Sequence, residues 1–236
     1  MTEGAGTEEV WSDDKFREAW SQQAEEIGRF NLAIFGKTGV GKSTLINAIF
    51  GADVAPTGIG EPVTMENHLY LHDGGFLGVL DTRGLEIGQD SDALIAELGA
   101  YLAAMRKQPL SDQIHIAWYC VRATDRRFED TEADFIRRLS KLGLPVVAVL
   151  TQVPSRDGVT HTDAVALSDH IAELALPIVG GRPILVMAAG DDFTGQVAHG
   201  LRELVEATFR VAPEGVERAF IAAQKVDLDR KRKQAH

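Results

Sequence analysis

The 236-residue sequence predicts an α/β fold in which a mainly parallel sheet carries helices on both faces. Short apolar runs without helical gaps, which are typical of buried strands, alternate along the chain with segments whose apolar residues recur every three or four positions. Strands that are separated by helices need crossover connections, and such connections make neighbouring strands parallel. We expect six strands, one of them antiparallel.

The expected elements follow one another in a regular order. Strands are predicted at residues 30–35, 65–71, 76–80, 114–121, 145–150 and 184–188. Helices are predicted at residues 42–50, 91–107, 130–142, 163–175 and about 195–210. The short connection His72-Asp73-Gly74-Gly75 suits a hairpin, so the second and third strands should form the antiparallel pair.

The chain divides into three segments, of which residues 29–212 hold the alternating strands and helices. Residues 1–28 carry eight acidic residues and apolar residues at helical spacing, which indicates a lead-in helix. Residues 213–236 form a further helix with the basic end Arg230-Lys231-Arg232-Lys233. Because no stop signal closes this helix, a longer parent protein with a membrane-associated helical region is one hypothesis.

Composition excludes several classes of function. The chain has 24 Lys and Arg against 35 Asp and Glu, a net charge of −11, so we expect no binding to DNA. The single cysteine, Cys120, excludes an internal disulfide and a multi-cysteine zinc site, and its apolar neighbours indicate a buried, inert thiol. The sequence has no run of about 18 apolar residues. We therefore expect a soluble, cytoplasmic protein.

The strongest motif is Gly36-Lys37-Thr38-Gly39-Val40-Gly41-Lys42-Ser43, which matches the phosphate-binding pattern G-x-x-x-x-G-K-[ST] between a buried strand and a helix. In such a loop, successive backbone N–H groups point at a polyphosphate, and the helix adds its positive end. The lysine supplies charge to the outer phosphates, and the serine hydroxyl is a ligand of Mg²⁺. The expected nucleotide-binding residues are Lys37, Thr38, Gly39, Val40, Gly41, Lys42, Ser43 and Thr44.

Two later segments follow this loop in the order expected for a nucleotide-dependent switch. Asp81-Thr82-Arg83-Gly84 comes directly after an apolar strand, where Asp81 can hold Mg²⁺ through water and the Gly84 N–H can reach the terminal phosphate. Pro62-Val63-Thr64 precedes the second strand, and we expect the Thr64 hydroxyl to be a further Mg²⁺ ligand. Thr57 is the alternative to Thr64.

These motifs, with Phe30-Asn31-Leu32-Ala33-Ile34-Phe35 before the loop and Leu45-Ile46-Asn47-Ala48-Ile49-Phe50-Gly51 after it, resemble the G domain of Era-like GTPases. The resemblance covers about residues 29–212 and is greatest to the bacterial members that often carry a helical carboxyl-terminal extension. It implies a P-loop NTPase fold, binding of GTP and GDP with Mg²⁺, and two loops that change conformation on hydrolysis.

The base-reading motif of this family is only partly present. Members usually end the fifth strand with Asn or Thr, Lys, any residue and Asp, whose carboxylate accepts two hydrogen bonds from guanine. Here Thr151-Gln152-Val153-Pro154 occupies that place, so Thr151 and Gln152 are the expected base-contacting residues and Pro154 offers no carboxylate. Asp157 can substitute if the loop of residues 154–158 folds back.

The last base-contacting element of the family, usually Ser-Ala, corresponds to Ala188-Ala189, whose backbone N–H groups can contact the guanine carbonyl. Arg122, Asp125, Arg126 and Arg127 form a charged loop that we expect to be solvated, with a partner surface as the alternative.

The candidate catalytic residues are Lys42, Thr64, Gly84 and Arg83. Arg83 would stabilise charge in its own chain or across a dimer, and the alternative is a solvent-facing arginine in the switch loop. Leu85 follows Gly84 where Ras-type enzymes have a glutamine that orients the attacking water. We therefore expect slow GTP hydrolysis, raised by an activating protein or by homodimer formation. The alternatives are a nucleotide-binding interaction module with little or no hydrolysis and a P-loop enzyme that uses ATP.

Overall fold

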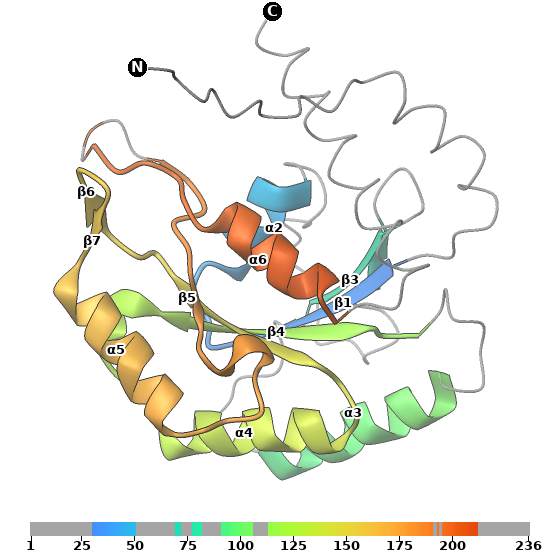
Figure 1. Ribbon diagram of the computed structural model, residues 1–236. Helices are drawn as coiled ribbons and strands as arrows, with labels where there is room; N and C mark the ends of the chain where they lie inside the picture. Colours follow the sequence, from blue (N-terminus) through green and yellow to red (C-terminus); the bar gives the residue numbers. More distant parts are fainter. Residues whose placement is uncertain are drawn as a thin grey trace, which may run out of the picture.

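The structure is a computed structural model that describes residues 30–50, 69–71, 77–81, 91–105, 113–190, 193 and 195–211 (Figure 1). The lead-in helix expected within residues 1–28, the connection of residues 72–75 and the helix expected within residues 213–236 lie outside the described residues.

Within this part of the chain, six strands form one sheet in the order β2-β3-β1-β4-β5-β8. β2 is antiparallel to β3, and the other neighbouring pairs are parallel, as the sequence predicts. The strands are β1 (Phe30–Phe35), β2 (Leu69–Leu71), β3 (Leu77–Asp81), β4 (Ile116–Arg122), β5 (Val146–Thr151) and β8 (Ile184–Leu185).

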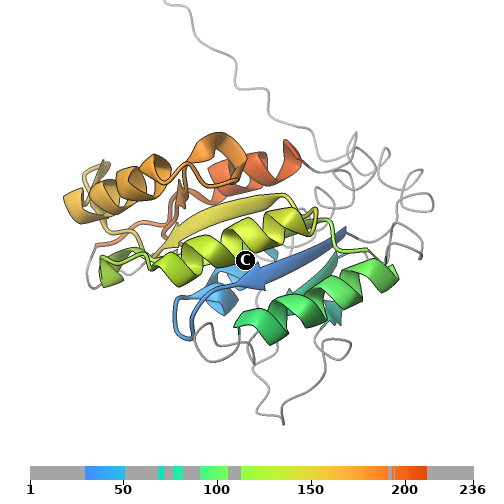
Figure 2. The ribbon, with the colours of Figure 1, turned by 90° about the horizontal axis from the view of Figure 1, so that it is seen from below.

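Helices cover both faces of the sheet, as expected for parallel strands joined by crossovers. They are α2 (Lys42–Phe50), α3 (Ser91–Met105), α4 (Asp130–Lys141), α5 (Thr162–Glu173) and α6 (Leu201–Phe209). α2 and α6 lie on one face, and Figure 2 shows α3, α4 and α5 across the other. Among the described residues, no helix combines the length and apolar character needed to cross a membrane.

The strand β1 shows how period-two alternation divides the core. Leu32 and Ile34 pack with α2 and α6, whereas Ala33 and Phe35 pack with α3, α4 and α5. All four side chains are almost completely buried. The continuous apolar run that identified this strand in the sequence is therefore a consequence of two covered faces.

Three segments differ from the sequence-based expectation. The last strand, predicted at residues 184–188, ends at Leu185. The last helix begins at Leu201 and not near residue 195, because His199 makes a backbone bridge with Met187 and Gly200 has a φ of +77°. A Cβ atom at position 200 would lie 1.9 Å from the Leu185 carbonyl oxygen, so only glycine fits this turn. In addition, β6 (Ser155–Arg156) and β7 (Val159–Thr160) form a short antiparallel ribbon after β5.

One buried hydrogen bond ties α6 to the centre of the sheet. The Trp118 indole Nε1 donates to the Thr208 hydroxyl at 3.0 Å, and that hydroxyl donates to the Leu204 carbonyl at 2.8 Å. Trp118 and Thr208 are both fully buried.

We predict that Trp118→Phe lowers the free energy of unfolding by about 1–3 kcal/mol, because it removes a buried donor and leaves unfilled volume. Urea unfolding measures this change. Val197→Ala, at a side chain that is 70% exposed, is the control and should change stability by less than about 0.5 kcal/mol. Equal stabilities of Trp118→Phe and wild type would contradict the packing described.

Cys120 lies on β4 and is fully buried, as its apolar neighbours predict. Burial raises the pKa of its thiol to about 12, although the charge of Lys42 acts in the opposite direction. The thiol should therefore give no reaction with Ellman's reagent at pH 8 in the folded protein, and one equivalent in denaturant.

The same shift predicts a pH effect on stability. The folded thiol keeps its proton above the unfolded pKa of about 8.5, so the wild-type free energy of unfolding should fall relative to Cys120→Ala as the pH rises above that value. Rapid native-state labelling of the thiol, or parallel pH profiles of the two proteins, would contradict this account.

Candidate functional site

The candidate site lies where the parallel strands end. β1 is the turning point of the strand order, because the chain first adds β3 on one side of β1 and then β4 on the other. Crevices at such switch points, beyond the carboxyl ends of the strands, are the usual ligand sites of open α/β sheets. The loop of residues 36–41 joins β1 to α2 at this place.

Positive φ angles give this loop its path: Gly36, Gly39 and Gly41 have φ values of +136°, +79° and +93°. Gly36 also passes close to the neighbouring strand, because a Cβ atom there would lie 2.3 Å from the Cys120 carbonyl oxygen. The spacing of glycines in the motif therefore has a steric cause in this chain.

Lys42, the first residue of α2, is buried within the loop. Its side chain is only 7% exposed, and its ammonium donates to the carbonyl oxygens of Gly36 at 2.7 Å and Lys37 at 3.0 Å. A buried cation held against the loop that precedes a helix N-terminus creates a site for a multiply charged anion.

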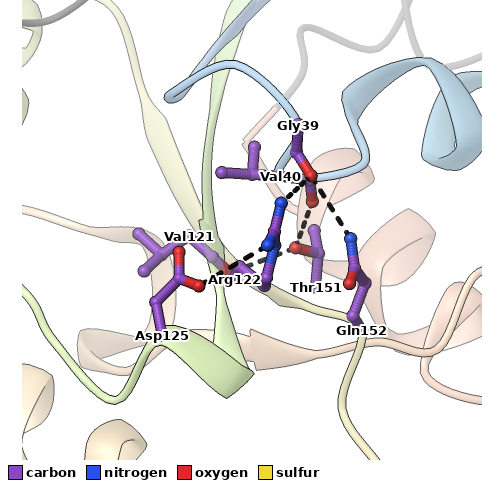
Figure 3. A network of polar contacts seen from close by, with 7 residues as sticks. All are labelled: Gly39, Val40, Val121, Arg122, Asp125, Thr151 and Gln152. Carbon is purple, nitrogen blue, oxygen red and sulfur yellow. Dashed lines mark hydrogen bonds and ion pairs between the residues drawn. The ribbon is translucent and has the colours of Figure 1, made fainter.

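The outer side of the loop is held by residues at the ends of β4 and β5 (Figure 3). The Thr151 hydroxyl lies 2.5 Å from the Val40 carbonyl and 3.2 Å from the Val121 carbonyl, and its single proton can serve one of them at a time. Arg122 Nη2 donates to the Gly39 carbonyl, and Gln152 Nε2 approaches the same oxygen at 3.4 Å.

The Lys37 side chain links the loop to the start of α4. Its ammonium lies 3.0 Å from Glu129 and 3.6 Å from Glu132. Burial works to lower the pKa of Lys37, but the hydrogen bond with Glu129 and the charges of both carboxylates outweigh it, so the pKa is raised. Hydrogen bonding and charge from Lys37 lower the pKa of Glu129.

Glu132 itself is almost completely buried, and burial raises its pKa against the opposing contacts of the Glu129 backbone N–H and Lys37. The Tyr119 hydroxyl lies 3.4 Å from Glu132, and burial raises the pKa of that tyrosine. A pocket of about 380 Å³, lined by charged side chains of both signs, lies between the loop and the start of α4.

Several sequence-predicted residues meet at this edge. Ser43 and Thr44 follow Lys42 in the first turn of α2. Asp81 ends β3 and pairs in register with Ile34 of β1, one residue before the strand ends. Thr64, Arg83 and Gly84 lie outside the described residues.

The predicted base-contacting residues are spread more widely. Thr151 and Gln152 touch the loop, and Ala188 and Ala189 follow β8. The loop after β5 forms the short ribbon of β6 and β7, and Asp157 is an exposed residue in the turn of that ribbon, with a φ of +53°.

The described residues at the loop suit Mg²⁺ together with phosphate. Mg²⁺ prefers oxygen ligands, keeps several waters and is usually bound through few protein groups plus substrate phosphates. Ser43 offers a hydroxyl in the first turn of α2, one residue after Lys42, and β3 brings Asp81 to the same edge of the sheet. Within the described ranges, no group of three or more His, Cys, Asp or Glu is placed to hold a metal ion by itself.

Arg122 is the residue that the sequence analysis assigned wrongly. It was expected in a solvated loop, but it is the last residue of β4, its side chain is 32% exposed, and it contacts the loop of residues 36–41. One signal was available in the sequence, because Arg122 directly ends the buried strand that contains Cys120.

Comparisons with known proteins agree with this geometry. A family model described as 50S ribosome-binding GTPase matches residues 31–152, more than half of the chain. GTPase Der of Nitrobacter winogradskyi is 32% identical over 191 residues, which cover 80% of this chain and 36% of Der. GTPase Era of Deinococcus radiodurans is 34% identical over 116 residues, which cover 48% of this chain and 34% of Era.

The chain thus spans about a third of the length of these curated relatives. Among solved structures, a probable GTP-binding protein engB superposes with a TM-score of 0.51 at 16% identity, covering 77% of this chain and 97% of engB. That likeness shows a shared fold. The family model, whose match includes the strand–loop–helix unit around Lys42, shows that the chain belongs to the Era-like family of P-loop GTPases.

Proposed function

We propose that this protein binds GTP and GDP with Mg²⁺, hydrolyses GTP slowly to GDP and phosphate, and acts as a nucleotide-state switch. The observation that carries the proposal is the buried ammonium of Lys42 inside the glycine loop between β1 and α2. The family of the chain supports guanine nucleotide as the ligand. Residues 29–212 would form the G domain, with helical segments at residues 1–28 and 213–236.

In this proposal the loop binds the phosphates. The amides of residues 37–44 and the positive end of α2 face the phosphate oxygens, and Lys42 moves its donors from loop carbonyls to the outer phosphates. Thr44 donates to the inner phosphate. Mg²⁺ would be held by the hydroxyls of Ser43 and Thr64 and, through water, by Asp81, and it would neutralise charge on the outer phosphates.

The base would lie beyond the outer side of the loop, between Gln152 and the backbone of Ala188 and Ala189. The contact of Gln152 with Gly39 supports this placement, because it sets the aliphatic stem of the glutamine next to the loop. Thr151 fixes the loop below it. Asp157 remains the proposed substitute for the missing carboxylate, and it needs a movement of the β6–β7 ribbon to reach a base.

At the terminal phosphate, the proposed groups are those of Lys42, Thr64, Arg83 and Gly84. Slow turnover follows from Leu85, which cannot orient water, so we propose that a homodimer or an activating protein raises the rate. We place the protein in the cytoplasm, with membrane association only through the basic end of residues 213–236 or a longer parent.

A second function is favoured by one observation. Pro154 stands where the family has a base-reading aspartate, and Leu85 stands where Ras-type enzymes have a glutamine that orients water. The chain could therefore hold nucleotide as an interaction module with little hydrolysis. Single-turnover phosphate release from GTP separates the two: cleavage that is lost in Ser43→Ala supports the GTPase, and tight binding without cleavage over hours supports the module.

We predict that Lys42→Ala weakens binding of GDP and GTP roughly 10- to 100-fold, because it removes a charge-assisted contact to phosphate. Isothermal titration calorimetry measures the affinities. Lys141→Ala is the matched control, since Lys141 is an exposed lysine in the last turn of α4. The phosphate role of Lys42 would be wrong if both variants bound nucleotide as wild type does.

We also predict a limited preference for guanine. With Mg²⁺, GDP and GTP should bind roughly 10- to 100-fold more tightly than ADP and ATP, well short of the roughly 10⁴-fold discrimination of sites built around a matched hydrogen-bonding group. Titrations of the four nucleotides with and without Mg²⁺ measure base and metal dependence together. Equal or tighter binding of ADP and ATP would identify an ATP-using protein and contradict the proposal.

A further inference from the structure

The Gly39 carbonyl oxygen is the meeting point of two side chains from neighbouring strands (Figure 3). Arg122 Nη2 donates to it from the end of β4, and Gln152 Nε2 approaches from the residue after β5 at 3.4 Å. The strand register fixes this convergence, because Arg122 pairs directly with Thr151, the residue before Gln152.

The two donors are unequal. Gln152 is neutral and its amide is at the limit of hydrogen-bonding distance, whereas Arg122 contributes a cationic donor. Asp125 is the other partner of Arg122, and its carboxylate lies 3.7 Å from Nη1, so it does not draw the guanidinium away from the loop. Arg122 is therefore the principal anchor of this carbonyl.

The packing around the guanidinium supports a dedicated contact. A Cβ atom at position 39 would lie 3.0 Å from Arg122 Nη2, so the absence of a side chain at Gly39 makes room for the arginine. The Arg122 Nε atom is buried without a hydrogen-bond partner. The Nε atom therefore gives up contact with solvent where the side chain lies against the loop, although the side chain as a whole is 32% exposed.

We propose that Arg122 is a positioning residue of the nucleotide site: by holding the Gly39 carbonyl on the outer side of the loop, it keeps the adjoining peptide N–H groups turned inward toward the phosphates. This inference rests on the proposed binding of nucleotide by the same loop. A peptide unit has its C=O and N–H on opposite sides, so an anchored carbonyl orients the amide of the next residue. Arg122 thereby sets affinity without touching the nucleotide.

The contact predicts a particular pattern of effects. Loss of the anchor should weaken GDP and GTP equally, because the loop amides serve the phosphates common to both. It should leave the preference for guanine over adenine unchanged, because the base is read elsewhere. If Arg122 acted only through its positive charge, removal of another positive charge at the same pocket would weaken nucleotide binding equally. The Arg127→Ala variant tests this.

The test compares four proteins by fluorescence with methylanthraniloyl-labelled GDP and GTP and with labelled ADP: wild type, Arg122→Met, Arg122→Lys and Arg127→Ala. Methionine keeps an apolar stem but no donor, and lysine restores one donor with the charge. Arg127 is an exposed arginine that lines the same pocket. Circular dichroism melts check that each variant is folded.

We expect Arg122→Met to raise the dissociation constants of GDP and GTP at least tenfold through faster release, with an unchanged ratio of GDP to ADP affinity. Arg122→Lys should recover most of the loss, and Arg127→Ala should bind within twofold of wild type. If Arg122→Met does not fold, Arg122→Gln takes its place, because its shorter side chain reaches less far toward the loop.

Two results would overturn the inference while leaving the proposed function intact: wild-type affinity of the Met or Gln variant, or equal losses in Arg127→Ala and Arg122→Met. Wild-type protein that binds none of the labelled nucleotides would instead remove the proposed function itself.

Discussion

The site depends on one constraint, which is that a loop can offer its amides to an anion only if its carbonyls are satisfied elsewhere. Each peptide unit has both groups, and a buried carbonyl without a donor costs about 1–3 kcal/mol. Here Thr151 serves the carbonyl of Val40 and Arg122 serves that of Gly39. Lys42 serves the carbonyls of Gly36 and Lys37 until, in the proposed function, it moves to the phosphates. The donors that hold the phosphate cradle throughout are thus those at the ends of β4 and β5.

The sheet supplies the rigid frame for these donors. β4 and β5 are parallel and paired over six residues, so Arg122 and Thr151 end side by side next to the loop that leaves β1. Two separate apolar clusters cover the two faces of this frame. Because interiors are close-packed, the positions of the strand ends are set by the core and not by the loop itself.

Local patterns were sufficient to predict the frame. The buried strand of residues 30–35 and the helix of residues 42–50 have the predicted bounds, because a continuous apolar run and a glycine-flanked motif are signals within a few residues. The helix after Gly200 was misplaced because the turn is set by contact with Leu185, which lies far away in the sequence. The role of Arg122 was missed for the same reason, since it depends on the register between strands.

The most direct measurement of the central claim is the response of the loop amides to phosphate. In ¹H–¹⁵N NMR spectra of the labelled protein, addition of Mg²⁺ and GDP should shift the amide resonances of Gly39, Gly41, Lys42 and Ser43 strongly downfield, as expected for new hydrogen bonds to phosphate oxygens. Saturating nucleotide that moves resonances only at other places in the fold, and leaves these four unchanged, would contradict the account.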